Sequence, residues 1–327
     1  MTNSAKESRN RQSKDENSVR DLNQAIGAAI KRLATAGVAS PAVDARELAE
    51  FVLGCRLYRA AGEFSAEQSE AYAQLVEKRA ARIPLQHLIG KMWFRDLELK
   101  CVPGVFIVRP ETEMVADSAI AEVRRLQKMG ESNPLVLDLC SGSGAIAIAV
   151  ATETQNSNVH AVEISPLAFA ISGENNRQYG SLVSFQQGDA LTVDSDFAGK
   201  VSIIVTNPPY VPPGHRLAPE VLADPELALY GGGADGLDFP RRLIQRSFQL
   251  LRPGGLLLLE HADEQANEIC KIAGAAGFSD PRTNLDLAQK PRFLSARKPA
   301  AHDDVVQGVK TGSPDFAKRM RNPNLRK

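Results

Sequence analysis

"LVLDLCSGSGAIAIAVA" (residues 135–151) is the stretch that decides the fold. It joins an apolar run typical of a buried strand to a turn of small residues and then to an apolar helix start. Gly142 and Gly144 let the backbone approach a ligand closely, and the N-terminus of the following helix offers unpaired N–H groups. With Ala147 in third place, the glycines also satisfy the dinucleotide-binding fingerprint. Taken alone, the segment fits either a nucleotide-containing cofactor or a purely structural strand–turn–helix unit.

The chain around this segment alternates between strand-like and helix-like runs. Strands are expected at 135–139, 159–164, 183–187, 201–206 and 255–261, helices near 145–154, 166–178, 239–251 and 263–276, and two short terminal strands near 281–286 and 292–297. Such alternation predicts an α/β fold, a doubly wound sheet in which most strands are parallel.

Polar residues follow the second and third of these strands. Glu163 lies about 20 residues beyond the glycines, where a carboxylate can accept both hydroxyls of a ribose. After the third strand, Asp189 can accept an adenine amino group, and the short Ala190 leaves room for the ring. Ligands bind outside the carboxyl ends of open α/β sheets, so these positions are expected to converge. NAD and S-adenosylmethionine share an adenosine, and both fit.

"VTNPPYVPP" (205–213), at the end of the fourth strand, distinguishes these cofactors. The prolines end the strand beyond Asn207 and stiffen the chain. The Asn207 side-chain oxygen and the Pro208 carbonyl are suited to accept the two N–H bonds of a planar NH₂ group. Its nitrogen lone pair then points toward an electrophilic methyl. Pro209 keeps the turn rigid, and Tyr210 can lie against the flat face of the group. The motif favours N-methylation and has no evident use in an NAD enzyme.

Composition narrows the class of protein further. The chain has 327 residues, and its 39 Lys and Arg balance 39 Asp and Glu, so it lacks the basic excess usual in a duplex-DNA binder. Its four cysteines are scattered, which argues against structural zinc or a disulfide framework, and no metal site is expected. No apolar signal core or run of membrane-spanning length occurs, so we expect a cytoplasmic protein without membrane contact.

The expected domain organisation has five parts. They are a disordered tail (1–17), a helical substrate-recognition domain (18–82), a β-hairpin linker (83–108) with Trp93 in its core, a methyltransferase domain (109–297) and a basic disordered tail (298–327). In the helical domain, Ser65 and Gln68 have the spacing of a capping box, and Gly37 and Gly54 are expected helix ends.

The chain resembles the bacterial peptide-chain release factor N5-glutamine methyltransferases, the HemK/PrmC family. "NPPY" by itself also occurs in DNA adenine and rRNA guanine methyltransferases. The resemblance is carried by segments in the family's order, which cover about 20–297: "PLQHLIGKMWF" (84–94), "RPETE" (109–113), "LDLCSGSGAIAIA" (137–149), "AVEIS" (161–165), "TNPPYVP" (206–212), "GLDFPRRLI" (236–244), "LRPGGLLLLEH" (251–261) and "DLAQKPRFLSAR" (286–297).

This resemblance implies a small helical domain, a β-hairpin and a Rossmann-like class I methyltransferase sheet with an antiparallel final strand. It implies S-adenosylmethionine as cofactor and, as partner, a release factor methylated on the glutamine of its Gly-Gly-Gln loop. The residues carried over are Cys140, Ser141, Gly142, Ser143 and Gly144 at the methionine end, Glu163 at the ribose, Asp189 and Ala190 beside adenine, and Asn207, Pro208, Pro209 and Tyr210 around the glutamine amide, with Asn207 also at the cofactor.

The sequence departs from the family pattern in places. Cys140 and Ser141 stand where a Gly-Thr pair is common, and Ala190 replaces an aromatic residue found in some members. Arg109, Glu111 and Glu113 resemble a family segment beside the cofactor. On physical grounds alone, the two acids are more simply explained as first-turn residues favoured by the helix dipole.

Two other functions fit part of the sequence. A nucleic-acid N-methyltransferase would need a basic surface and a base-flipping pocket. An NAD-binding oxidoreductase or a non-catalytic nucleotide-binding module would leave "NPPY" unused. His215, just after the motif, invites a general-base role, but a methylated amide nitrogen is cationic and loses its proton readily. His261 is expected to be structural.

Overall fold

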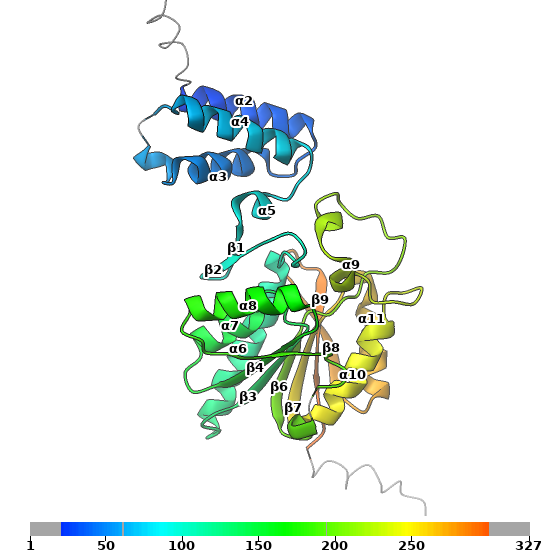
Figure 1. Ribbon diagram of the computed structural model, residues 1–327. Coiled ribbons are helices and arrows are strands. Elements are labelled where there is room, and N and C mark those ends of the chain that lie inside the picture. The colour runs from blue at the N-terminus through cyan, green and yellow to red at the C-terminus, as the bar shows by residue number, and fades with distance from the viewer. Residues whose placement is uncertain (1–20, 61, 194, 301–327) are drawn as a thin grey trace, which may run out of the picture.

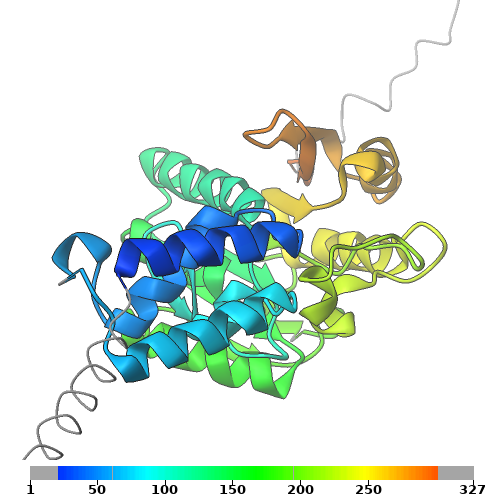
Figure 2. The same ribbon diagram turned by 90° about the horizontal axis from the view of Figure 1, so that it is seen from above.

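The computed structural model describes residues 21–60, 62–193 and 195–300 (Figure 1). A helical region lies at one end of the molecule, above a small hairpin and a large sheet (Figures 1 and 2). The expected tail 1–17 and all of the C-terminal tail beyond residue 300 lie outside the described residues. No helix in the described ranges is both long enough and apolar enough to cross a membrane.

The helical region contains α2 (Leu22–Thr35), α3 (Pro41–Leu53) and α4 (Ala66–Ala80). Its helix ends are those that the sequence predicts. The Ser65 hydroxyl accepts from the Gln68 amide and the Gln68 side chain accepts from Ser65, which confirms the capping box. Gly54 ends α3 in the left-handed conformation. The three helices enclose a separate core that includes Leu33, Leu48 and Phe64.

The segment expected to be a hairpin over 83–108 is a hairpin only in its middle. It begins with a short helix, α5 (Leu85–Ile89), and the strands are β1 (Lys91–Phe94) and β2 (Leu97–Lys100). Trp93 is not a core residue, because Met92 and Phe94 on the other face of β1 are the buried ones. Its side chain is 52% exposed, with the Lys91 ammonium 5.8 Å from the ring centroid.

The large sheet has the predicted Rossmann-like architecture. Its strand order is β5-β4-β3-β6-β7-β9-β8; the first five are parallel and β9 is antiparallel to both neighbours. The chain leaves β3 in one direction to β4 and returns on its other side as β6, so the carboxyl end of β3 is the switch point where ligands bind. The strands are β3 (Leu135–Leu139), β4 (Asn158–Glu163), β5 (Ser184–Gln187), β6 (Val201–Thr206), β7 (Leu251–Glu260), β8 (Ser279–Leu285) and β9 (Pro291–Arg297).

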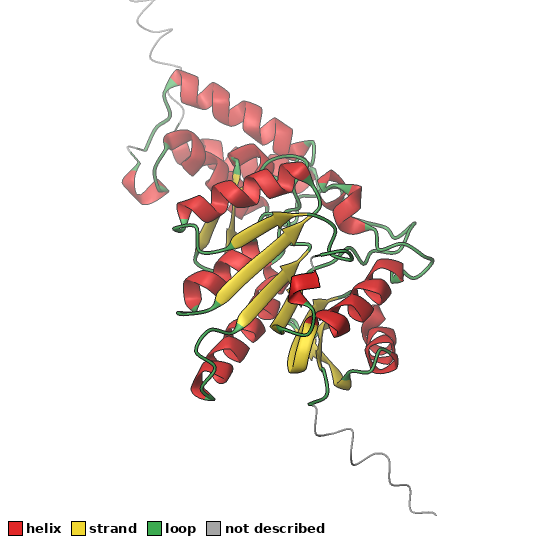
Figure 3. Ribbon diagram, turned by 60° about the horizontal axis from the view of Figure 1, so that its bottom comes forward, coloured by secondary structure: helices red, strands yellow, loops and turns green. Residues whose placement is uncertain are grey.

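Helices cover both faces of this sheet (Figure 3). On one face α6 and α7 bury the sheet side chains on the Val136 side, and on the other α10 and α11 bury those on the Leu137 side. The helices are α6 (Glu113–Lys128), α7 (Ala145–Glu153), α8 (Pro166–Gln178), α9 (Glu226–Leu229), α10 (Asp238–Leu250) and α11 (Ala266–Ala275). The expected helices do not include α6, although the interpretation of Glu111 and Glu113 as first-turn acids implies a helix start there, and Val115, Ala119 and Val123 have helical spacing.

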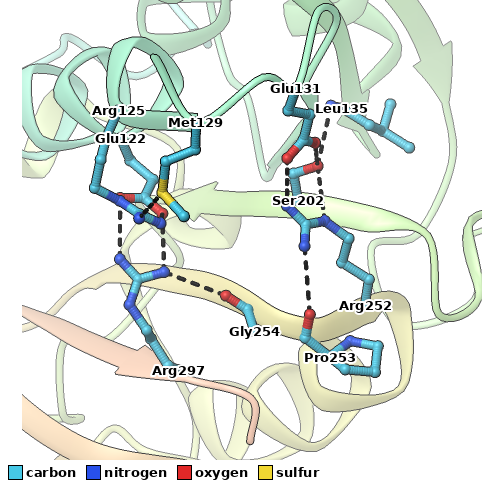
Figure 4. Close-up of polar contacts among 10 residues, drawn as sticks. All are labelled: Glu122, Arg125, Met129, Glu131, Leu135, Ser202, Arg252, Pro253, Gly254 and Arg297. Carbon is cyan, nitrogen blue, oxygen red and sulfur yellow. Dashed lines mark hydrogen bonds and ion pairs between the residues drawn. The ribbon is translucent and has the colours of Figure 1, made fainter. Parts of the chain in front are cut away.

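Two groups of polar contacts fasten the sheet at the amino ends of its parallel strands (Figure 4). Buried Glu122 of α6 accepts hydrogen bonds from Arg125 and, at 2.8 and 3.0 Å, from Arg297 at the end of β9. Glu131 bonds to Ser202 and Arg252 on β6 and β7. Lys298 was expected to open the tail, but its ammonium donates to two main-chain carbonyls at 2.8 Å. These contacts therefore hold α6, β6, β7 and β9 together at this end of the sheet.

The helical region is joined to the segment that follows β6 by a cluster of ions. Arg79, 5% exposed, donates to Asp44 at 2.6 Å and to Glu220 at 2.9 Å, and Arg82 binds both Glu220 oxygens at 2.6 and 2.5 Å. Partial burial raises the pKa of the Glu220 carboxyl, but hydrogen bonds from Arg82 and Arg79 outweigh it and lower the pKa to about 2.

We expect Glu220→Gln to lower the free energy of unfolding by about 1–3 kcal/mol at neutral pH, because two arginines lose a charged partner. The folded pKa is depressed, so this stabilisation is complete above the ordinary Glu pKa and is lost as the pH falls from about 4.5 toward 2. Urea unfolding across this pH range measures the difference between variant and wild type. Glu77→Gln, which breaks the exposed pair with Arg32, is the matched control and should change stability little. Equal losses in both variants would contradict the prediction.

Candidate active site

A pocket opens at the carboxyl ends of β3, β4, β5 and β6. Most of the residues predicted for the cofactor and the amide line it: Cys140, Ser141, Gly142, Ser143, Glu163, Asp189, Ala190, Asn207 and Pro209. Gly144, Pro208 and Tyr210 do not line it. The switch point of the sheet thus brings together side chains from four separate loops.

The turn after β3 has an unusual backbone. Cys140 adopts φ +62°, although a non-glycine side chain rarely occupies this region. Gly144 lies behind the pocket, because a Cβ there would be 2.8 Å from the ring of Phe185, so its role is packing at the start of α7. The Ser141 hydroxyl lines the pocket and has no hydrogen-bond partner among the described residues. A polar ligand group would satisfy this oxygen.

Glu163 organises two loops as well as lining the pocket. It is 7% exposed; one carboxylate oxygen accepts from the Gly142 amide and the other from the Ser165 amide, each at 2.7 Å. A carboxylate offers about four lone-pair positions, so both oxygens can also accept ribose hydroxyls. The residues present therefore fit an adenosine cofactor. The carboxylate that would bind the ribose also holds the glycine loop in shape.

Asp189 and Ala190 lie at the next strand end. Asp189 Oδ1 accepts from the Leu191 amide at 2.9 Å, which is a local turn contact, and Oδ2 makes no hydrogen bond within the described ranges. Ala190 is 5% exposed and adds a small apolar surface. One oxygen thus fixes the side chain, and the other stays available to a ligand N–H.

The opposite wall of the pocket comes from residues that the sequence analysis does not single out. They are Phe106, Val108, Thr112, Pro225, Leu227, Ala228, Tyr230 and Phe239. The stretch 225–230 returns from the ion cluster at Glu220, and its Tyr230 forms an isolated bridge with Val211. Thr112 and Phe239 fall within the segments "RPETE" and "GLDFPRRLI", but neither is assigned a role from the sequence. The other residues carry no motif, because many side chains of suitable size could provide such a wall.

The turn Asn207–Tyr210 is held from behind by close main-chain packing. A Cβ on Gly231 would lie 2.7 Å from the Pro209 carbonyl oxygen and 1.9 Å from that of Gly236, so only glycine fits there. The Gln265 side chain donates to the Tyr210 carbonyl at 2.8 Å and to that of Asp235 at 2.9 Å. The rigidity expected from the prolines is therefore reinforced by contacts more distant in the sequence.

One hydrogen bond fixes the orientation of the Asn207 side-chain amide. Its Nδ2 donates to the Thr112 hydroxyl at 3.3 Å, so the NH₂ end is occupied and the oxygen end is free to accept. The Pro208 carbonyl accepts no hydrogen bond from the described residues. The Tyr210 hydroxyl donates to Glu260 at 3.0 Å, which places its ring at the end of β7. The Asn207 side-chain oxygen and the neighbouring Pro208 carbonyl are therefore both free to accept.

A second pocket lies on the other side of Asn207. Asn207, Phe106 and Ala228 line both pockets, whereas Tyr210 and Arg292 line only the second. The second pocket also contains Arg109, His215, Asp235, Asp263, Glu264 and Gln265. The two cavities therefore meet at Asn207, whereas Pro208 lines neither of them.

The remaining candidates fall outside the first pocket. Arg109 pairs with buried Asp224, Glu111 is exposed, and Glu113 accepts from the Arg95 amide at 2.8 Å. His215 is exposed at the second pocket. His261 is fully buried with both ring nitrogens engaged, by Ala262 and Thr283, and burial lowers its pKa, so it is a structural residue.

Comparison with known proteins agrees with this geometry. Residues 24–90 match the family model "PrmC N-terminal domain", and residues 118–268 match "Methyltransferase small domain". The chain is 44% identical to the release factor glutamine methyltransferase of Streptomyces coelicolor, over 84% of this chain and 96% of that protein. It is 36% identical to the protein of the same name from Corynebacterium glutamicum, over 85% and 99%.

Another relative, matched over less of its length, is named for a different reaction. The 4-amino-L-phenylalanine/4-methylamino-L-phenylalanine methyltransferase of Streptomyces pristinaespiralis is 37% identical over 62% of this chain and 69% of that protein. The near-complete coverage of the first two relatives and the 44% identity of the first decide the assignment. The chain belongs to the family of release factor glutamine methyltransferases.

Proposed function

We propose that this enzyme transfers a methyl group from S-adenosylmethionine to the side-chain amide nitrogen of the glutamine in the Gly-Gly-Gln loop of a peptide-chain release factor. One observation carries the proposal: two pockets meet at Asn207, whose amide oxygen is left free by the bond from Nδ2 to Thr112. The relatives named for this reaction support the choice of substrate. A release factor works at the ribosome, which would place the enzyme in the cytoplasm.

The first pocket is the proposed cofactor site. S-adenosylmethionine, when bound there, supplies a methyl group activated by a sulfonium. In this proposal Cys140–Ser143 surround the methionine end, with the unpaired Ser141 hydroxyl as a polar contact, and Gly144 packs behind them. Glu163 accepts the ribose hydroxyls, and Asp189 and Ala190 border the adenine.

The turn Asn207–Tyr210 is proposed to align the amide nitrogen. An amide nitrogen is a poor nucleophile because its lone pair is delocalised into the carbonyl. If Asn207 Oδ1 and the Pro208 carbonyl accept its two N–H bonds, electron density shifts to nitrogen and the lone pair faces the first pocket. The product nitrogen is cationic until one proton leaves, so the exposed His215 is not required as a strong base.

The helical region is the proposed second contact for the release factor. A glutamine at a loop tip offers little surface, and stable protein recognition needs roughly 1,200–2,000 Å² in total. A groove between α3 and α4 is lined by Phe51, Val52, Leu75 and Lys78, and Phe51 is 47% exposed. No nucleic-acid contact is part of this proposal.

A methyl-transfer assay tests the function directly. Labelled methyl groups from S-adenosylmethionine should reach release factor, but not free DNA or rRNA supplied in parallel. Calorimetry should show binding of S-adenosylmethionine and none of NAD. Label appearing in nucleic acid and not in release factor would overturn the proposal.

We expect Asn207→Ala to reduce kcat by about 100-fold or more, because losing one preorganised partner typically costs about 2.7–4 kcal/mol of barrier. Cofactor affinity should stay within a few-fold, since Asn207 addresses the nitrogen. Single-turnover kinetics and calorimetry separate the two effects. A variant with near wild-type turnover would refute the role of this turn.

Glu163→Ala should weaken S-adenosylmethionine binding by about 1.5–3 kcal/mol, the usual worth of hydrogen bonds to a charged acceptor. The loss also removes the acceptor for the Gly142 and Ser165 amides. Glu163→Gln is the sharper variant, because its NH₂ group would face one of these N–H groups. Titration of both variants should give weaker binding with little change in turnover at saturating cofactor. Unchanged affinity would assign the ribose contact elsewhere.

Phe51→Ser tests the recognition role of the helical region in the intact chain. We expect kcat/KM for the intact release factor to fall about tenfold, the equivalent of 1.4 kcal/mol, with no change for a short Gly-Gly-Gln peptide. Val43→Ser, another exposed apolar residue on α3 that lies outside the groove, is the control. Equal effects on peptide and protein would argue against recognition through this groove.

A further inference from the structure

Glu260 is a buried carboxylate next to the reaction site that the proposed chemistry does not use. It is the last residue of β7, after four leucines, and is 1% exposed. One oxygen accepts from the Tyr210 hydroxyl at 3.0 Å, and the other, Oε2, has no hydrogen-bond partner among the described residues. A buried carboxylate with an unsatisfied oxygen costs stability, so its presence in an apolar strand requires an explanation.

Thr112 connects this carboxylate to Asn207. Its hydroxyl is fully buried and accepts from Asn207 Nδ2 at 3.3 Å. Because Thr112 accepts in this hydrogen bond, the single proton of its hydroxyl is available to another acceptor. The hydroxyl lies close enough to the Glu260 carboxyl to oppose the rise of its pKa, although no Thr112–Glu260 hydrogen bond of ordinary geometry is formed. The Asn207–Thr112 and Tyr210–Glu260 hydrogen bonds therefore lie next to each other, with Glu260 Oε2 unpaired between them.

The protonation state of Glu260 sets the direction of these hydrogen bonds. An ionised carboxylate can only accept, so the Thr112 proton can turn toward the unpaired Glu260 Oε2 while the hydroxyl oxygen accepts from the Asn207 NH₂ group. A protonated Glu260 can instead donate to Thr112, which is then free to donate to the Asn207 oxygen. That arrangement turns the Asn207 amide over and presents NH₂ where the substrate nitrogen needs an acceptor.

Several charged or titratable groups face Glu260. They are Glu111 before α6, Tyr210 after β6, and Arg292 on β9, whose guanidinium is also paired with Asp286 at 3.0 Å. Its chain neighbour His261 is engaged through both nitrogens. Burial raises the pKa of Glu260 to about 7, in spite of the opposing effects of Thr112, Tyr210 and Arg292.

We propose that ionised Glu260 is a positioning residue that acts through Thr112 to hold the Asn207 amide with its oxygen toward the substrate nitrogen, and that protonation of Glu260 reverses the amide. The inference rests on the proposed methyl transfer to a glutamine amide. The proposal assigns Glu260 to the site. It also predicts how activity depends on pH: turnover rises as Glu260 loses its proton with increasing pH.

The test compares kcat against pH at saturating cofactor and release factor. Wild type should show a single rise with a midpoint near pH 7. Glu260→Gln should lower the high-pH kcat by roughly 10- to 100-fold and abolish the rise, with cofactor affinity unchanged within about twofold. Thr112→Val should do the same, and Thr112→Ser should restore both rate and profile. Glu122→Gln, a buried carboxyl at the far end of the sheet, should lower stability and leave the profile intact.

A second measurement does not depend on activity. With ¹⁵N-asparagine labelling, the side-chain NH₂ signal of Asn207, assigned with Asn207→Ala, should shift with a midpoint near pH 7 in wild type and not in Glu260→Gln. If the Asn207 signal shifts with pH but neither wild type nor any variant methylates release factor, the proposed function is wrong and the link between Glu260 and Asn207 is supported. An Asn207 signal insensitive to pH, or a Glu260→Gln enzyme with the wild-type pH profile, would overturn the role of Glu260.

Discussion

Main-chain contact between Gly231 and the turn Asn207–Tyr210 is the constraint on which the site depends. The backbones approach so closely that a single added carbon would collide with two carbonyl oxygens. The segment that leads into Gly231 forms a wall of both pockets, and its earlier part is held by Arg109 at Asp224 and by Arg79 and Arg82 at Glu220. The segment that ends at Gly231 thus links the hydrogen-bond acceptors of the turn to the helical region.

The two pockets differ in charge in a way that suits their proposed ligands. Among the residues that line the first pocket, the charged ones are Glu163 and Asp189, both acidic. A sulfonium cofactor is favoured there, and its neutral thioether product is held less strongly because one positive charge is lost. The second pocket contains both cations, Arg109 and Arg292, and acidic side chains. Such a balance of charge is compatible with an uncharged amide in a protein loop.

Sequence reasoning succeeds here where a residue's role depends on its position at a strand end. Cys140, Glu163, Asp189 and Asn207 each stand at or just beyond the end of a strand, so sheet topology alone brings them to one edge. It does not reach Thr112, Gln265 or Glu260, which contact the turn across 95, 55 and 50 residues of chain, and no local pattern encodes such pairings. The roles assigned to the predicted site residues stay predictions, although nearly all of them line one cavity. The exposure of Trp93 follows from strand alternation and could have been predicted.

The anchoring of Lys298 has a practical consequence. Its main chain pairs with Gly254 and Gly255 near the amino end of β7, so the described chain ends on the side of the sheet away from the pockets. An enzyme tethered to a sensor surface at the end of the described chain, beside Lys298, would therefore turn its catalytic face toward the solution. Attachment there would let a protein as large as a release factor approach without interference from the support.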